Sequence, residues 1–266
     1  MHFPNSKHLW PLLALLLLLP AGCAKSPGGG STSPVSGPQL IVTMTVAGNI
    51  NPNYYYYILF NVNNTPGPGN TRVTGPVPVV ASANNTGNGY AAGAFTNYVE
   101  YHSAQPGGTN FNYYAVDATL FNSQPLGSGK LIQQQASGNT LTFQLPLASL
   151  ATSSITVDQI NSLQVNFITT NSVPQNVQNL NTPKYFDALY PPQQASNSYV
   201  NLIIRSGVTV LANTFSNTTS GVNESAGDVA QYVNNAPVIV SGTTADGVTT
   251  SDLDITDWTI TLTAGS

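Results

Sequence analysis

The sequence predicts an all-β fold for residues 39–266, an antiparallel β-sandwich of about ten strands with little helix. Three observations support this fold class. Short runs rich in Val, Ile, Tyr, Phe and Thr recur along the chain, turn-forming residues separate them, and helical periodicity is nearly absent. Many short strands with regular turn signals are typical of a sandwich.

The first strands are the clearest. Residues 40–46 place Val42, Met44 and Val46 on one face and threonines on the other, as expected of a strand with one wet side. Residues 54–62 are apolar on both faces and predict a central strand covered by a second sheet. Further strands are expected at 95–102, 111–120, 130–136, 140–145, 163–169, 199–204, 208–212, 238–240 and 253–262. The turn signals between runs include Ser137-Gly138-Asn139 and Asp246-Gly247.

Helical signals are confined to short segments. Residues 149–151 and 156–163 can each form a turn or two, with Thr156 as N-cap and Gln159 in the capping-box position. Residues 171–198 contain four prolines and many Asn and Gln, so we expect a long loop between strands there. Loops of this length are usually functional or disordered.

An export signal precedes the domain. Residues 12–19 are apolar, too few for the ~20 residues that a membrane span needs, and Pro20-Ala21-Gly22 leads to Cys23, the only cysteine. This segment resembles a bacterial lipoprotein signal, although Pro20 stands where leucine is usual. The resemblance implies that residues 1–22 are removed and that Cys23 is lipidated and anchors the chain to a membrane, in the cell envelope outside the cytoplasm. An ordinary secretory signal is the alternative.

The residues that follow Cys23 predict a flexible tether. Residues 24–38 consist mainly of Gly, Ser, Pro and Thr and have almost no large apolar side chain to bury. A chain of this type has a root-mean-square reach of roughly 20 Å. We therefore divide the protein into a signal (1–22), a lipidated cysteine with its tether (23–38) and one folded domain (39–266).

Composition excludes several functions. Charged residues make up 6% of the chain, and it has only six Lys and Arg. Nucleic-acid binding needs clustered cations, so we expect no binding to nucleic acid.

The composition also predicts a weak dependence of stability on pH, because only ten acidic residues and few histidines are available to titrate.

Catalytic signatures are absent from the sequence. His102 is the only histidine after Cys23, it lies in an expected strand, and no Gly-x-Ser-x-Gly motif accompanies it. A pair of carboxylates for glycoside hydrolysis is conceivable, but the sequence does not select one. We therefore expect that the protein is not an enzyme.

The densest acidic segment is 246–257. Asp252 and Asp254 alternate with Leu253, so an extended strand would place both carboxylates on one face, an arrangement suited to calcium. The alternative is that these aspartates cap turns or face solvent.

The C-terminal order of a turn, Asp-Leu-Asp-Ile and a strand bearing Trp258 is similar to the closing strands of family 9-type carbohydrate-binding modules. The resemblance spans about fifteen residues and implies a jelly-roll-like sandwich that recognises sugars through aromatic faces. Tyrosine can stack on a sugar and hydrogen-bond to it. We therefore expect a ligand site in which the loop residues join the C-terminal strand; it comprises Tyr185, Phe186, Asp187, Tyr190 and Trp258.

Together these features predict a lipid-anchored envelope protein that presents a β-sandwich binding module, with a glycan as the expected ligand. The alternative is a structural or assembly subunit of the envelope, whose partner is another envelope protein and which has no small-molecule ligand. An open groove lined by the aromatic side chains would favour the first, and a flat uncharged patch would favour the second.

Overall fold

The structure is a computed structural model, and all of its described residues belong to one compact unit of the chain, Val35–Ser266. The described residues are 36–67, 73–74, 92–93, 95–104, 109–117, 122–173, 184–189, 199–220, 224, 226–233 and 236–264. The predicted signal, Cys23 and nearly all of the tether therefore lie outside them, as does Tyr190. No helix among the described residues is long and apolar enough to cross a membrane.

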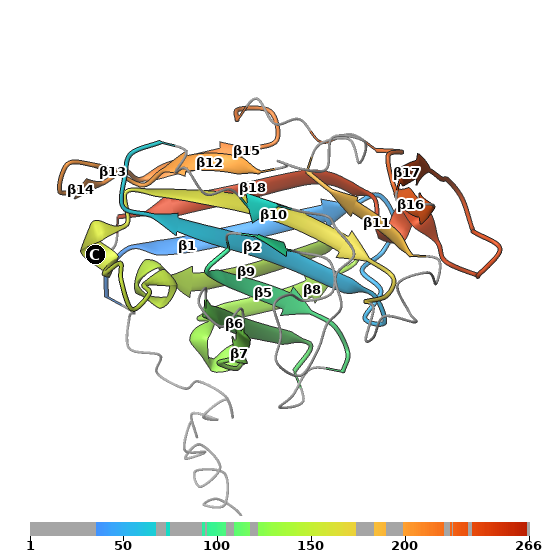
Figure 1. Cartoon of the computed structure of the whole chain (residues 1–266), viewed down its shortest axis with the longest axis horizontal. Coiled ribbons are helices and arrows are strands. Elements are labelled where there is room, and N and C mark those ends of the chain that lie inside the picture. Colours follow the sequence, from blue (N-terminus) through green and yellow to red (C-terminus); the bar gives the residue numbers. More distant parts are fainter. Residues whose placement is uncertain are drawn as a thin grey trace, which may run out of the picture. The chain divides into compact units, whose positions relative to one another are not determined.

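The fold is all-β, as predicted, and its sheets are antiparallel (Figure 1). Sheet A has five strands in the order β15-β18-β1-β9-β8. Their bounds are β15 Asn213–Ser216, β18 Ile255–Thr263, β1 Gln39–Val46, β9 Thr140–Pro146 and β8 Gln133–Ser137. The central strand β1 pairs with two strands that are distant in sequence on its two sides, so long-range pairing determines this sheet.

Sheet B follows the order β17-β16-β11-β10-β2-β5-β6-β7, and β12 pairs with β10 beside this path. Strands β10 and β2 form its long centre. The bounds are β17 Ala236–Ile239, β16 Ala230–Val233, β11 Tyr185–Ala188, β10 Ser162–Thr170, β12 Val200–Ile203, β2 Tyr55–Asn63, β5 Asn97–Tyr101, β6 Phe111–Asp117 and β7 Asn122–Pro125. Strand β12 pairs with residues 162–165 of β10 and β11 with residues 168–170, so the two short strands share the edge of β10 that β2 leaves open.

Short elements complete the described chain. Two strand pairs form separate two-stranded sheets, β3 Val73–Thr74 with β4 Ala92–Gly93, and β13 Arg205–Ser206 with β14 Thr209–Val210. The 3-10 turns are η1 Ser128–Lys130, η2 Leu147–Leu150, η3 Val157–Gln159 and η6 Thr250–Asp252. The predicted cap at Thr156 is confirmed, since Gln159 Oε1 accepts a hydrogen bond from the Thr156 N–H at 3.0 Å.

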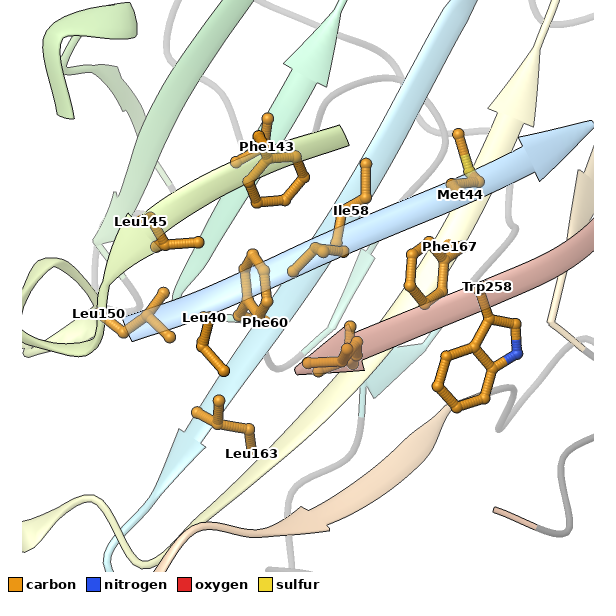
Figure 2. Packing of buried hydrophobic residues seen from close by; sticks show 14 of the residues in the cluster. Leu40, Met44, Ile58, Phe60, Phe143, Leu145, Leu150, Leu163, Phe167 and Trp258 are labelled. Carbon is orange, nitrogen blue, oxygen red and sulfur yellow. The ribbon is translucent and has the colours of Figure 1, made fainter. Parts of the chain in front are cut away.

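The main core lies between the two sheets. Leu40 and Met44 of β1 contribute to the same buried cluster as Phe60 of β2 and Phe167 of β10, and Figure 2 shows these side chains between the crossing strands. The burial of β1 alternates along the strand, as the sequence pattern predicted. The sandwich is therefore held by the hydrophobic effect across two faces.

The outer face of sheet B is also buried. Tyr57, Leu59 and Tyr98 form a second cluster there with Ile168, and the nine residues of β10 are all buried. Polar side chains share this face, because Gln164 and Asn166 alternate with the inward-facing Val165 and Phe167. The prediction that β2 is covered on both faces is therefore confirmed.

The structure differs from prediction in the segment 171–198. The sequence predicts a loop, but Tyr185–Ala188 forms β11, which pairs with β10 and β16. The four residues are buried. Proline and asparagine around this strand concealed it, because a four-residue strand has too few positions to show a period. The strand count also exceeds the ten expected, since short pairings such as β13 with β14 leave a weak sequence signal.

Candidate metal centre

Three carboxylates meet beside the start of β18. Asp187 belongs to β11, whereas Glu224 and Asp228 lie in the segment that leads into β16. One oxygen from each of the three lies within 4.8 Å of the others. The pairing of Phe186 with Ala230 explains the encounter, because it places the residues just before β16 alongside the end of β11.

Asp187 is completely buried. Its Oδ1 accepts a hydrogen bond from the Ala188 N–H at 2.8 Å, and its Oδ2 accepts one from the Ile255 N–H at 2.6 Å. Nearby, the Thr169 hydroxyl donates to the Leu253 carbonyl. These contacts join β10 and β11 to the start of β18, so the Asp187 side chain is held in one orientation.

Glu224 is placed by an asparagine. The Asn217 side-chain amide donates to the Glu224 carbonyl at 2.9 Å, and its oxygen accepts from the Glu224 N–H. The same amide donates to the Thr256 carbonyl at 3.3 Å. This asparagine therefore ties the Glu224 segment to β18.

Asp254 lies at the margin of the centre. Both of its oxygens accept from the Gly227 N–H, at 3.0 and 2.9 Å, one residue before Asp228. Burial raises the pKa of Asp254, and the Asp228 charge raises it further. A fourth carboxylate therefore adds negative charge to the same region.

The electrostatics of the centre disfavour three bare charges. Burial raises the pKa of Asp187 well above its usual range, and the Glu224, Asp228 and Asp254 carboxylates act in the same direction. The Ile255 N–H opposes them in part. Burial also raises the pKa of Asp228. Every charged neighbour that shifts the Asp187 pKa is a carboxylate, so the described charges that act on this side chain are all negative.

Two chemical states relieve this repulsion. The carboxyls can share protons, or they can bind a cation. Oxygen-only ligands suit a hard cation such as calcium, which takes six to eight oxygens from carboxylates, carbonyls and water. Glycoside hydrolysis fits poorly, because it needs carboxylates that flank an accessible bond, whereas Asp187 is 0% and Glu224 5% exposed.

The structure does not place Asp252 and Asp254 on one strand face, as the sequence predicted. Asp252 lies in η6, not in a strand, and its Oδ1 accepts from the Asn49 N–H at 2.9 Å. Asp254 precedes β18 and faces Gly227 instead. The predicted placement of both carboxylates on one strand face is therefore wrong, because Asp252 closes a turn, while Asp254 borders the centre. The assumption of an extended strand through Leu253 caused the error.

The aromatic residues predicted to stack on a sugar are buried. Tyr185 packs with Val229 and Leu253, and its hydroxyl donates to Asp246 Oδ2 at 2.6 Å. Phe186 is in the outer cluster of sheet B. Trp258 is 1% exposed and lies 5.6 Å from the Phe167 ring in the main core (Figure 2).

Stacking on a sugar needs an open ring face, so the burial of Tyr185, Phe186 and Trp258 contradicts the predicted aromatic groove. Of the predicted ligand residues, Asp187 alone joins the centre, while Tyr190 lies outside the described residues. Sequence reasoning missed Glu224 and Asp228 as partners of Asp187. The only local signal was a pair of acids four residues apart ahead of an apolar run.

Comparisons with protein families, with curated proteins and with solved structures find no match to this chain.

Proposed function

We propose that this protein is a lipid-anchored, extracytoplasmic β-sandwich module whose C-terminal strands are closed by a calcium ion, and that the module binds glycans. The observation that carries the calcium part is the meeting of Asp187, Glu224 and Asp228 within 4.8 Å, without a cationic side chain among the groups that shift the Asp187 pKa. A divalent cation would offset two of the three negative charges and would join β11 to the segment before β16.

The N-terminal sequence supports a location in which such a site is useful. A lipidated Cys23 would hold the domain outside the cytoplasm, where calcium-binding modules work with dissociation constants of about 10⁻⁴–10⁻³ M. The described cluster consists of carboxylates alone, which also favours calcium over softer metals.

The glycan part of the proposal is supported by composition. A domain with few charges recognises a neutral, hydroxyl-rich ligand more readily than a charged one. The burial of Tyr185, Phe186 and Trp258 favours a second candidate, a structural or assembly subunit of the envelope, because the expected aromatic contacts with a sugar are missing.

The calcium proposal can be tested by thermal unfolding of the full-length protein in detergent micelles, first in a chelator and then with added calcium. At a calcium concentration 100 times the dissociation constant, mass action stabilises the fold by about 2.7 kcal/mol. For a domain of this size, the melting temperature should rise by about 5–10 °C.

Matched variants locate the effect. Asp187→Asn and Asp228→Asn should each reduce the calcium-dependent rise, whereas Asp158→Asn should keep it, because the Asp158 side chain is 89% exposed and pairs with Arg205. Equilibrium dialysis with calcium measures binding directly, so a variant that merely loses stability can be recognised. If the parent protein binds no calcium and melts identically in chelator and calcium, the proposal fails.

A further inference from the structure

The outer surface of sheet A presents a regular grid of mostly uncharged polar side chains, mainly threonine and glutamine. Strand β1 alternates, with Val42 and Met44 in the core and Thr43 on the opposite face. Thr43 pairs with Thr142 of β9 on one side and with Thr259 of β18 on the other. The row continues to the two sheet edges, because Thr142 pairs with Gln135 and Thr259 with Ser216.

A second row runs parallel to the first. Ile41 pairs with Thr261 and Gln144, which pair in turn with Thr214 and Gln133. Figure 1 shows the five strands side by side. We call the outward-facing residues of these strands the threonine face; they are Gln39, Ile41, Thr43, Thr45, Gln133, Gln135, Ser137, Thr140, Thr142, Gln144, Pro146, Thr214, Ser216, Asp257, Thr259, Thr261 and Thr263.

The geometry of a sheet spaces this grid evenly. Neighbouring strands lie about 4.8 Å apart, and residues on the same face recur about every 6.8 Å along a strand. Cross-strand bonds orient some of the hydroxyls. Thr43 Oγ1 lies 3.2 Å from Thr142 Oγ1, and Thr214 Oγ1 lies 3.1 Å from Thr261 Oγ1. The face therefore offers hydroxyl, amide and methyl groups at repeating positions.

The charge of this face limits the kind of partner. Among the outward-facing residues of these five described strands, only Asp257 is charged. An anionic membrane or a nucleic acid would find no cation there, and an acidic or basic peptide would gain little. The face also lacks the aromatic, Met and Arg side chains that are enriched at the centres of protein interfaces.

A flat uncharged patch was expected to indicate an envelope subunit, but this one is built mainly of hydroxyl and amide groups and not of apolar side chains, so we propose that the threonine face binds a neutral polysaccharide. This inference rests on the proposed glycan-binding role and moves the contact surface from the buried aromatic residues to sheet A. Threonine hydroxyls and glutamine amides both donate and accept hydrogen bonds, as sugar hydroxyls require, and threonine methyls can lie against C–H groups of the sugar. The repeating grid is complementary to a polymer that repeats its hydroxyls.

A lipid anchor would make weak contacts between each domain and the polysaccharide sufficient for stable attachment. Many copies held on one membrane by Cys23 would bind a polymer multivalently, so a modest affinity per domain yields stable attachment. Because binding would depend on short hydrogen bonds, it should change little with salt.

The test is depletion of the full-length protein, in a non-glycosidic detergent, onto particles of cellulose or chitin, which are neutral, and of chitosan or pectate, which are charged. The decisive variant is Thr43→Val with Thr142→Val, which removes two neighbouring hydroxyls and keeps β-branched side chains. Loss of two hydrogen bonds should weaken binding to the neutral particles about tenfold or more. Gln135→Lys, at an exposed edge position, should also weaken it.

Thr209→Val is the matched control, because Thr209 is exposed in the separate β13–β14 hairpin and should leave binding unchanged. If the parent binds a neutral polysaccharide and the Thr43/Thr142 variant binds it equally, the threonine face is not the contact surface, although the glycan role stands. If the parent binds neither neutral polysaccharide, or only the charged ones, both the face and the glycan role are overturned.

Discussion

Gly48 should be intolerant of any side chain, because it follows β1 where the chain runs against the segment before β18. The Gly48 N–H donates to the Ser251 carbonyl at 2.7 Å, and the next N–H, that of Asn49, donates to Asp252 Oδ1. A Cβ at position 48 would lie 2.3 Å from Asp252 Oδ1 and 2.8 Å from the Ser251 carbonyl carbon. The Asp252 carboxylate can rotate away, but the backbone of Ser251 must shift.

The magnitude follows from these contacts. Overpacking of this kind costs about 1–3 kcal/mol, and displacement of Asp252 removes a hydrogen bond that contributes about 1 kcal/mol at this exposed position. Restriction of the unfolded chain by alanine offsets about 0.4–1 kcal/mol. We expect Gly48→Ala to lower the free energy of unfolding by about 1–3.5 kcal/mol, or the melting temperature by roughly 2–14 °C.

Urea denaturation of the parent and four variants tests this reasoning. Gly129→Ala is the control, since an added Cβ there would have no atom within 4 Å. The double variant Gly48→Ala with Asp252→Ala should lose less unfolding free energy than the sum of the losses of the two single variants. The reason is that the Asp252 carboxylate, the atom group nearest to the added Cβ, is then absent. A Gly48→Ala protein as stable as the parent, or strict additivity with Asp252→Ala, would refute the argument.

Three further predictions concern other parts of the chain. In chelator, lowering the pH from 7 to 5 should stabilise the protein. The raised pKa values of Asp187 and Asp228 mean that the folded state binds more protons than the unfolded state in this pH range. This gain in stability should vanish in saturating calcium. Burial lowers the pKa of His102, and this shift reduces stability as the pH falls, so urea midpoints are also compared in a His102→Gln variant. A midpoint that falls on acidification in that variant contradicts the prediction. Phe167→Ala should lower the free energy of unfolding by about 3–5 kcal/mol by opening the core beside Trp258, whereas Val208→Ala, at a 93% exposed site, should change it by less than about 0.5 kcal/mol; similar losses for both would be inconsistent with the packing. Cys23→Ser should release the exported protein from the membrane fraction, and persistence of a processed variant there after fractionation would argue against a single lipid anchor.

Local sequence was sufficient for the class of fold. Strand β1 and strand β9 have alternating burial that their residues predict, and Gly138, with a φ of +58°, occupies the turn between β8 and β9 that the sequence marked. These features were predictable because side-chain alternation and turn conformation depend on residues a few positions apart. The same alternation in β18, with Trp258, Ile260 and Leu262 on one face, could also have placed the tryptophan in the core.

Tertiary structure alone decided the candidate sites. Asp187 and Asp254 are each more than 20 residues away from the Glu224–Asp228 pair, so only the pairing of β11 with β16 and the approach of β18 could bring these carboxylates together. Composition predicts a weak pH dependence of stability, whereas the raised pKa values of the buried Asp187 and Asp228 predict a stronger one, because burial depends on the tertiary structure. The sequence determined which side chains each strand offers to its two faces. The register between distant strands determined which of those side chains became neighbours, both in the carboxylate centre and across the rows of the threonine face.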